Sequence, residues 1–456
     1  MSKPKPMQWE KLLTRERLGK NESEEKKAVT RTCFQQDYDR LVFSSPFRRL
    51  KDKTQVFPLS KHDYVRTRLI HSLEVSCVGR SLGSLVGKKI IERHERSLVT
   101  EKQKKDLEPF NASDFGDIVS AACLAHDLGN PPFGHAGEGA IATAFDSWDK
   151  NNKDDLTEKQ RKDFGKFEGN AQGFRLLTRL EMSPKPGGMQ LTCPTLAAFT
   201  KYPRESYIPE DQLKIYKGRK SIDKYGFFQS EKDLFSQVAE TVGLIRHDKD
   251  IALWARHPLA FLVEAADDIC YHIIDLEDGY RMGYVSYAET KDLLNQIAQL
   301  SNPNEDIHSD GEKIKRLRAK AINKLILEIT ALFVDKEDDL LAGTFDADLI
   351  SLSSYRNCLQ NIKDKTREKV FRNPEIVKIE IAGNQVINNL FEKLANGLLQ
   401  NNQKKANFEY ILPVKYRPIE GDSLYSNLMR ITDYISGMTD TYATELFQQL
   451  QGISLK

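Results

Sequence analysis

The stretch AACLAHDLGNPPFGHAGEGA brings together four side chains that could do chemistry. His126 and Asp127 are adjacent, and His135 and Glu138 follow a prolyl turn. On the helix expected over 117–128, His126 falls on the apolar face, where an imidazole needs a polar partner. A core histidine bonded to a backbone carbonyl is the simplest interpretation of one such residue, so the pair alone is a weak signal.

Two further stretches supply partners for this pair. In HDYVRTRLIHSLEVS, His71 lies on a strongly amphipathic helix and points partly inward. In HPLAFLVEAADDICYHIIDLEDG, Asp267, Tyr271 and Asp275 fall four residues apart and share one helix face. Apolar residues cover most of the remaining surface of that helix, which predicts burial. A buried row of carboxylates is costly unless it meets a cation or a polar ligand.

Two imidazoles and two carboxylates suit a divalent metal with open coordination positions, such as Mn²⁺, Fe²⁺, Mg²⁺, Ni²⁺ or Zn²⁺. Thiolate ligands are missing from the pattern, which argues against a structural zinc. The residues therefore predict a metal site of the catalytic type. Taken by themselves, they leave the choice between Asp267 and Asp268 open.

The elements that must position these residues read as helices. Periodicity predicts helices over 64–92, over 114–128 with an acidic N-cap and a stop at Gly129, and over 258–280. Only EIVKIEIAG, residues 375–383, is typical of a strand. LSNPNEDIHSDGEK is the best candidate for a linker, and helical periodicity resumes after it. We therefore expect a mainly α fold with little β structure.

Composition narrows the class of protein. Lys+Arg 68 against Asp+Glu 66 gives a formal charge of +2, so the overall balance favours neither a nucleic-acid binder nor a membrane-surface protein. The six cysteines form no CxxC pair, and no apolar run approaches the length of a membrane span. Residues 1–33 are polar and lack the apolar stretch of a signal peptide. We expect a cytoplasmic protein whose N-terminal arm orders only against a partner.

The H…HD…D pattern on helices resembles the HD-domain superfamily of metal-dependent phosphohydrolases. Longer stretches are similar to motifs of the deoxyguanosine triphosphate triphosphohydrolases and related dNTP triphosphohydrolases: FRRLKDKTQVFPL, DYVRTRLIHSLEVSCVGRSLG, AHDLGNPPFGHAGE, FEGNAQ, HPLAFLVEAADDICY and DYISGMTD. The resemblance covers about residues 34–450. It implies an HD-domain helical core over 34–299 and a C-terminal helical region over 300–456 that completes the nucleotide pocket.

The resemblance also implies a reaction and its metal ligands. The ligands would be His71, His126, Asp127 and Asp267, since the family places tyrosine and aspartate four and eight residues after its metal aspartate. The reaction converts a dNTP and water into a deoxynucleoside and inorganic triphosphate, with attack at the α-phosphorus. We expect Mn²⁺ or Mg²⁺ as cofactor, with Fe²⁺, Ni²⁺ and Zn²⁺ as alternatives, and dGTP as the first candidate substrate.

Catalytic and substrate roles follow by the same resemblance. His135 would exchange a proton at the scissile phosphate ester, with Glu138 orienting it. The alternative for Glu138 is a carboxylate that stabilises the N-terminus of the following helix, and both roles can hold. The expected substrate-binding residues cover the sugar, the phosphates and the mouth of the pocket, and they are Gln55, Arg68, Asn170, Tyr271, Asp275 and Arg430. Weaker candidates are Lys201, Lys217, Arg219, Lys220, Lys224 and Tyr434.

Two other functions compete with this interpretation. An HD phosphohydrolase acting on nucleoside monophosphates or signalling nucleotides would release monophosphate or pyrophosphate. A regulatory protein that binds dNTPs or single-stranded nucleic acid would show steep salt dependence without turnover. The resemblance implies a homo-oligomer, commonly a hexamer, and leaves open a dNTP activator and single-stranded nucleic acid as partners. No membrane partner is expected.

Overall fold

The computed structural model describes residues 5–20, 31–56, 65–97, 111–152, 156–301, 309–399 and 404–454. Within these ranges the fold is mainly α, as the sequence predicted, and β pairing is limited to isolated bridges. The α-helices are α1 (Trp9–Leu12), α2 (Cys33–Val42), α3 (Ser45–Arg49), α4 (Arg68–Ser97), α6 (Ala112–Ala125), α7 (His135–Asn151), α8 (Glu158–Gly165), α9 (Gly169–Arg175), α10 (Cys193–Phe199), α11 (Glu210–Leu213), α12 (Lys232–Thr241), α13 (Ala260–Arg281), α14 (Tyr287–Ala298), α15 (Asp310–Asp335), α16 (Glu337–Leu341), α17 (Arg356–Thr366), α18 (Pro374–Leu399), α19 (Lys404–Ile411), α20 (Leu424–Ser436) and α21 (Asp440–Gln451).

Helices α4 and α6 form the centre of the first core. Their backbones approach closely because small residues meet at the crossing: a Cβ on Gly83 would lie 2.7 Å from the carbonyl oxygen of Phe115. Helix α6 begins with a capping box in which Asn111 is the N-cap and Asp114 the third helical residue. The sequence predicted an acidic N-cap at Asp114, and the structure has Asn111 in that position instead. The close crossing fixes the N-terminal end of α4 relative to the C-terminal end of α6.

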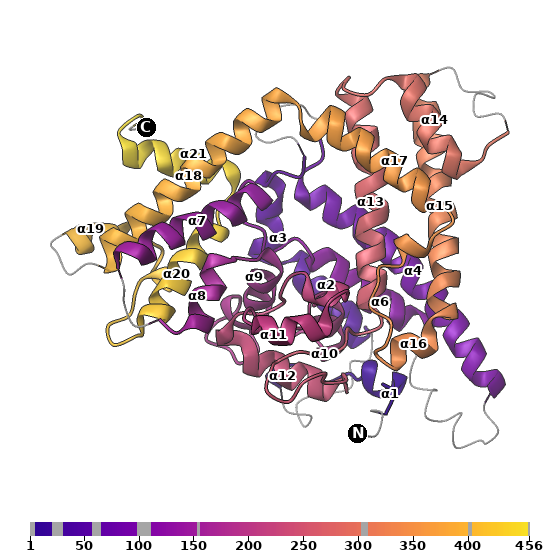
Figure 1. The fold of residues 1–456 in the computed structure, drawn as a ribbon, viewed down its shortest axis with the longest axis horizontal. Coiled ribbons are helices and arrows are strands. Elements are labelled where there is room, and N and C mark those ends of the chain that lie inside the picture. The colour runs from indigo at the N-terminus through magenta and orange to yellow at the C-terminus, as the bar shows by residue number, and fades with distance from the viewer. Residues whose placement is uncertain are drawn as a thin grey trace.

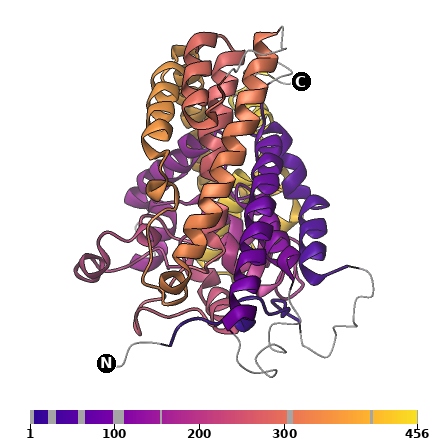
Figure 2. The ribbon, with the colours of Figure 1, turned by 90° about the vertical axis from the view of Figure 1, so that its right-hand side faces the viewer.

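Helix α13 completes this core and packs against α4, α6, α10, α15 and α17. It is buried over almost its whole length, as its apolar composition predicted. The helices α4, α13 and α15 stand upright and side by side in Figure 2, in indigo and salmon. Since α13 has little exposed surface, its carboxylates must face the interior or a cavity.

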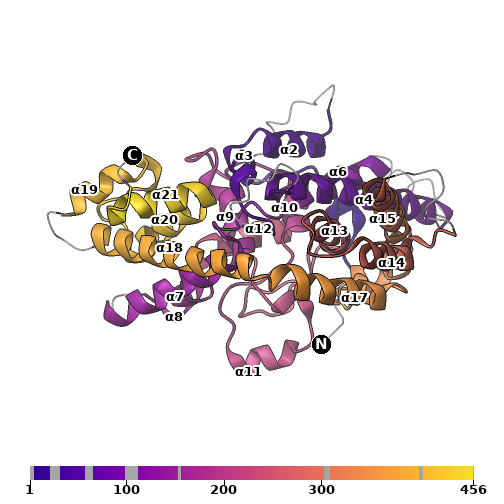
Figure 3. The same cartoon turned by 90° about the horizontal axis from the view of Figure 1, so that it is seen from above.

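A second core cluster lies at the other end of the molecule. It joins α7, α8, α18, α20 and α21, whose apolar faces bury one another. Helix α18 runs along the molecule between the two ends, with α17 near one end and α19, α20 and α21 at the other (Figures 1 and 3). Both core clusters take residues from either side of residue 300, so the expected domain boundary there stays a prediction.

Two expectations from the sequence are wrong. Residues 375–383 form the start of α18 and not a strand. Their β-branched residues alternate, but the buried positions of the whole element recur at helical spacing from Ile376 through Gly383 to Ile387 and beyond. Tertiary packing of that long apolar face outweighs the local strand preference.

The N-terminal arm is the second correction. Within residues 5–20, Trp9 and Leu12 are buried in the first core, and the Trp9 indole Nε1 donates a 2.9 Å hydrogen bond to Glu337. This segment therefore orders against its own chain, because its few apolar residues find a place there. Residues 21–30, and 302–308 of the expected linker, lie outside the described residues.

None of the helices that the structure describes combines the length and apolar character needed to cross a membrane.

Candidate metal and nucleotide site

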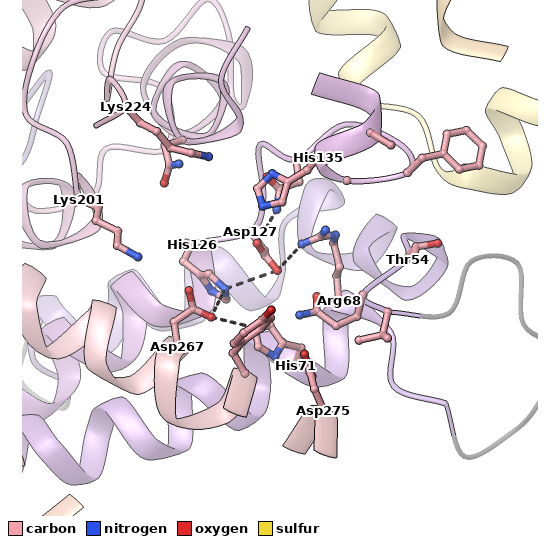
Figure 4. A pocket seen from close by; sticks show the side chains of 18 of the residues that line it. Thr54, Arg68, His71, His126, Asp127, His135, Lys201, Lys224, Asp267 and Asp275 are labelled. Atoms are coloured by element: carbon pink, nitrogen blue, oxygen red, sulfur yellow. Dashed lines mark hydrogen bonds and ion pairs between the residues drawn. The ribbon is translucent and has the colours of Figure 1, made fainter. Parts of the chain in front are cut away.

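Three ligand-type side chains from three helices meet at one point. His71 Nε2 lies 3.2 Å from Asp267 Oδ1, and His126 Nε2 lies 3.6 Å from the same oxygen. The three ligand atoms all lie within 4.8 Å of one another (Figure 4). The structure brings Asp267 to both imidazoles, whereas Asp268 lies outside this group.

The helices place these donors for identifiable reasons. His71 lies one turn into α4, His126 follows directly after the last residue of α6, and Asp267 lies two turns into α13. His126 also meets the simpler expectation, since its Nδ1 lies 2.6 Å from the carbonyl oxygen of Cys123. That bond assigns the Nδ1 proton and leaves Nε2 as the lone-pair donor toward the site, as metal-binding histidines require.

Asp127 stands beside this group, held by two other side chains. Arg68 donates to its Oδ2 over 2.7 Å, and Asn130 donates to its Oδ1 over 2.5 Å. Its Oδ2 also lies 3.5 Å from His126 Nε2. Burial alone would raise the pKa of Asp127, but Arg68 and the histidines lower it to about 2. Asp127 is thus an ionised carboxylate at the edge of the site.

The charges of the group favour a cation. Burial works against ionisation of Asp267, yet the neighbouring His126, the bond from His71 and Lys201 bring its pKa well below the usual range. Burial likewise tends to lower the pKa of His71, but its contact with Asp267 raises it on balance. A carboxylate that depends on two imidazoles for compensation is one that a divalent cation would stabilise directly.

His135 and Glu138 form a second pair at the start of α7. His135 Nδ1 lies 2.7 Å from Glu138 Oε2, and Glu138 Oε1 accepts a 2.7 Å bond from the backbone N–H of Gly169. The hydrogen bond to Glu138 raises the pKa of His135. Burial tends to raise the pKa of Glu138, but His135 brings it below the usual value. The imidazole is exposed at 79% and its partner at 10%, so the carboxylate is the fixed member.

The three ligand residues, Asp127 and His135 line one cavity of about 540 Å³. The expected residues Gln55, Arg68, Asn170, Tyr271 and Asp275 line it, as do the weaker candidates Lys201 and Lys224. The side chains of Lys201 and Lys224 point toward the site from the side opposite Arg68 (Figure 4). Burial tends to lower the pKa of Lys201, but Glu264 raises it above the usual value, so this amine stays charged.

The sugar-binding candidates lie along α13. The ring of Tyr271 stacks on Phe371 with centroids 6.0 Å apart and planes 7° apart. Asp275 is 2% exposed, and its Oδ2 has no hydrogen-bond partner among the described residues. Burial raises the pKa of Asp275 to about 8, and His71 and Arg66 offset that rise only in part because Asp278 and Asp267 add to it. An unsatisfied carboxyl group at a cavity wall is a group that a ligand can satisfy.

Several expected residues are not brought to this cavity. Arg430 bonds Asp422 over 2.7 Å and lines a separate cavity of about 620 Å³. Tyr434 packs in the second core, and its hydroxyl lies 2.8 Å from the hydroxyl of the exposed Tyr442. Arg219 contacts His247 and Lys220 contacts Asp348, and neither lines the cavity. Lys217 does not line the cavity either.

Phe371 and Glu380 also line the cavity, and neither was expected there from the sequence. Phe371 ends a short π-helical turn just before α18, and Glu380 lies within α18. The strand expected over 375–383 concealed the face that Glu380 shares with the cavity. If the helical spacing of apolar residues had been extended upstream from Leu390, it would have placed Glu380 on a helix.

A helical core in which two imidazoles and an aspartate meet at a cation-lined cavity is the arrangement of an HD-type phosphohydrolase. Residues 350–449 match a family model described as a phosphohydrolase-associated domain. The chain is 54% identical to a deoxyguanosinetriphosphate triphosphohydrolase-like protein of Synechocystis sp., over 98% of this chain and 100% of that protein. It is 40% identical to a protein of the same name from Pseudomonas aeruginosa, over 98% and 99%.

A deoxyguanosinetriphosphate triphosphohydrolase of Salmonella paratyphi A is 29% identical over 92% of this chain and 94% of that enzyme. These matches run over nearly the full length of both proteins, so they cover the core and the C-terminal helices together. The chain belongs to the deoxyguanosinetriphosphate triphosphohydrolase family.

Proposed function

We propose that the protein hydrolyses deoxynucleoside triphosphates to deoxynucleoside and inorganic triphosphate, with a divalent metal as cofactor and dGTP as the first candidate substrate. One observation carries the proposal: His71, His126 and Asp267 converge at the wall of a cavity that Arg68, Lys201 and Lys224 also line. A cavity with three metal-ligating atoms and three cationic side chains suits a polyanionic substrate that reacts at a metal.

The donor set fits a divalent metal. Two Nε2 atoms and a carboxylate oxygen meet within 4.8 Å, and the bond between His126 Nδ1 and a backbone carbonyl orients one ring as a ligand. Asp127 would be the fourth ligand. A bound cation would compensate its negative charge and so would weaken its ion pair with Arg68. Nitrogen and carboxylate donors suit Mn²⁺, and Mg²⁺ is the second choice. A cation bound there would acidify water and offset phosphate charge.

His135 would act as the general acid. Water attacks the α-phosphorus, the bond from phosphorus to the 5′ oxygen breaks, and that oxygen needs a proton. Glu138 engages Nδ1 of His135, so Nε2 is the atom that delivers the proton. The raised pKa of His135 keeps it protonated in a larger fraction of molecules near neutral pH. Glu138 is itself held by Gly169, which fixes the direction of the imidazole.

The remaining cavity residues would bind the nucleotide. Arg68, Lys201 and Lys224 would neutralise the phosphates. The face of Tyr271, supported by Phe371, would pack on the sugar at C2′ and exclude a ribose hydroxyl. The unpartnered Asp275 would accept or donate a hydrogen bond at the 3′-hydroxyl.

Product analysis tests this proposal. The metal-loaded protein is incubated with each of the four dNTPs and with GTP, and the products are separated by chromatography. We expect deoxynucleoside and triphosphate from dNTPs, with GTP turned over far more slowly. Asp267→Asn keeps the shape of the ligand and is the matched inactive control. Release of pyrophosphate or monophosphate would assign the other type of HD phosphohydrolase, and binding of dNTPs without turnover would assign a regulatory protein.

A further inference from the structure

One carboxylate at the start of α21 joins two separate segments of the cavity wall. Asp440 is 1% exposed, and its Oδ1 accepts a 3.0 Å hydrogen bond from the backbone N–H of Phe133. Its Oδ2 accepts a 2.9 Å bond from the backbone N–H of Thr54 and a second bond from the Thr54 hydroxyl. Three donors from two segments, 79 residues apart in sequence at Thr54 and Phe133, thus share one buried side chain.

The Phe133 segment carries the general acid. Phe133 has a φ of 62° and Gly134 a φ of 59°, which places a bulky side chain in the left-handed region. That conformation costs free energy and persists only where the surroundings hold it. Asp440 holds the amide of Phe133, and the ring packs where a Cβ on Gly383 would lie, 2.5 Å from the ring. His135 begins α7 directly after this turn, so its position depends on the same constraints.

The Thr54 segment carries a sugar-binding candidate and leads into the metal site. Thr54 pairs with Thr67 in an antiparallel bridge, and the N–H of Arg68 donates to the carbonyl of Lys53. The amine of Lys53 donates to the carbonyls of Asn130 (2.6 Å) and Ser436 (2.8 Å). Gln55 follows directly after Thr54 and lines the cavity. Ser436, at the end of α20, therefore bonds to Lys53 of this segment, and Asp440, at the start of α21, bonds to both segments.

Helix capping does not account for Asp440. The N-cap of α21 is Thr439, whose hydroxyl accepts from the backbone N–H of Tyr442. The carboxylate of Asp440 accepts hydrogen bonds from Thr54 and Phe133, both far from α21 in the sequence. Its bonds are directed to the cavity wall rather than to its own helix.

We propose that Asp440 is a positioning residue, which sets the distance between Gln55 and His135 by bridging Thr54 and Phe133. This rests on the proposed function only for the roles of Gln55 and His135. Lys53 also links the two segments, through its bond to the Asn130 carbonyl, and it joins them to Ser436. The Asp440 carboxylate is therefore one of two links from the C-terminal helices to this part of the cavity wall, and it bonds to backbone N–H groups of both segments. The hydrogen bonds of the Asp440 carboxylate go to Thr54 and Phe133 and not to the metal-ligand candidates.

A double-mutant cycle tests the coupling to His135. Asp440→Asn keeps the size but offers a single acceptor oxygen, so one of the two segments loses its bond. We expect kcat for dNTP hydrolysis to fall about 10- to 100-fold, as for a lost hydrogen bond to a charged group. In the His135→Ala background the same change should cost less than about threefold, because residues that act as one unit are not additive. An equal loss in both backgrounds would overturn the proposal.

Hydrogen exchange provides a readout without turnover. In Asp440→Asn, amides in at least one of the segments 53–56 and 133–135 should exchange faster, whereas the control Thr441→Val should leave both segments unchanged. That control removes the neighbouring hydroxyl bond to Asp52, which reaches neither segment. Unchanged exchange in Asp440→Asn would overturn the proposal whatever the activity. If the wild-type protein released no triphosphate, the proposed function would fail while exchange still decided the role of Asp440.

A second variant covers the case in which Asp440→Asn does not fold. Thr54→Val removes only the hydroxyl donor to Asp440 and keeps the backbone bond. We expect faster exchange in 53–56 and a rise in KM of about threefold or more, as for a lost hydrogen bond, with kcat little changed. Exchange in that segment equal to wild type would overturn the bridging role.

Discussion

In the metal-free protein, Asp275→Asn is expected to become more stable relative to wild type as the pH rises. Asp275 is 2% exposed, its Oδ2 lacks a hydrogen-bond partner among the described residues, and burial raises its pKa from 3.8 to about 8. The native state therefore holds a proton that the unfolded chain releases. Stability from this group is fully present below pH 3.8 and is lost as the pH rises toward 8.

The magnitude follows from the size of that difference. About four pH units at 1.36 kcal/mol each correspond to a loss on the order of 5 kcal/mol once the pH exceeds 8. Between pH 6 and pH 8 the expected change is about 2 kcal/mol. Asparagine does not titrate, so the free energy of unfolding of Asp275→Asn should gain about this much relative to wild type over the same interval.

Urea unfolding of both proteins after metal removal, at pH 6, 7, 8 and 9, measures the effect. Other buried groups titrate in both proteins and cancel in the difference between the two curves. Asp292→Asn makes the same substitution at an exposed position of α14 and is the matched control. A difference that stays flat from pH 6 to pH 9 would show that Asp275 is already ionised in the native protein at pH 6.

Four further outcomes are expected. His126→Ala should lose both bound metal, measured by elemental analysis, and turnover, while circular dichroism stays unchanged; full metal content would remove it from the ligand set. His135→Ala should keep metal and substrate binding but lose turnover by roughly two to four orders of magnitude. Because Glu138 raises the pKa of His135, kcat should fall as the pH rises through the pKa of His135, and Glu138→Gln should move this fall to lower pH. If the fall in kcat stays at the same pH in Glu138→Gln, another group is responsible for it. Tyr271→Ala should narrow the ratio of dGTP to GTP turnover, and an unchanged ratio would exclude steric selection against the 2′-hydroxyl.

The sequence by itself determined the residue types and the helices that carry them. The periodicity around His71, the HD pair after an apolar helix and the buried α13 could be read directly, because each depends on spacing within one helix. The resemblance supplied what spacing could not, the choice of Asp267 over Asp268. The mainly α fold also followed from local patterns.

Tertiary structure alone decided the rest. Tertiary packing of α18, with Ile376 in the first core and Val386 onward in the second, made residues 375–383 helical against a local preference for strand. It also brought Glu380 to the cavity. It placed Arg430 in another cavity and buried the segment around Trp9. It also paired Asp440 with Phe133 and Thr54 across more than 300 residues of sequence. Such contacts depend on which surfaces compete for burial in the folded chain, and a pattern within one segment carries no information about that competition.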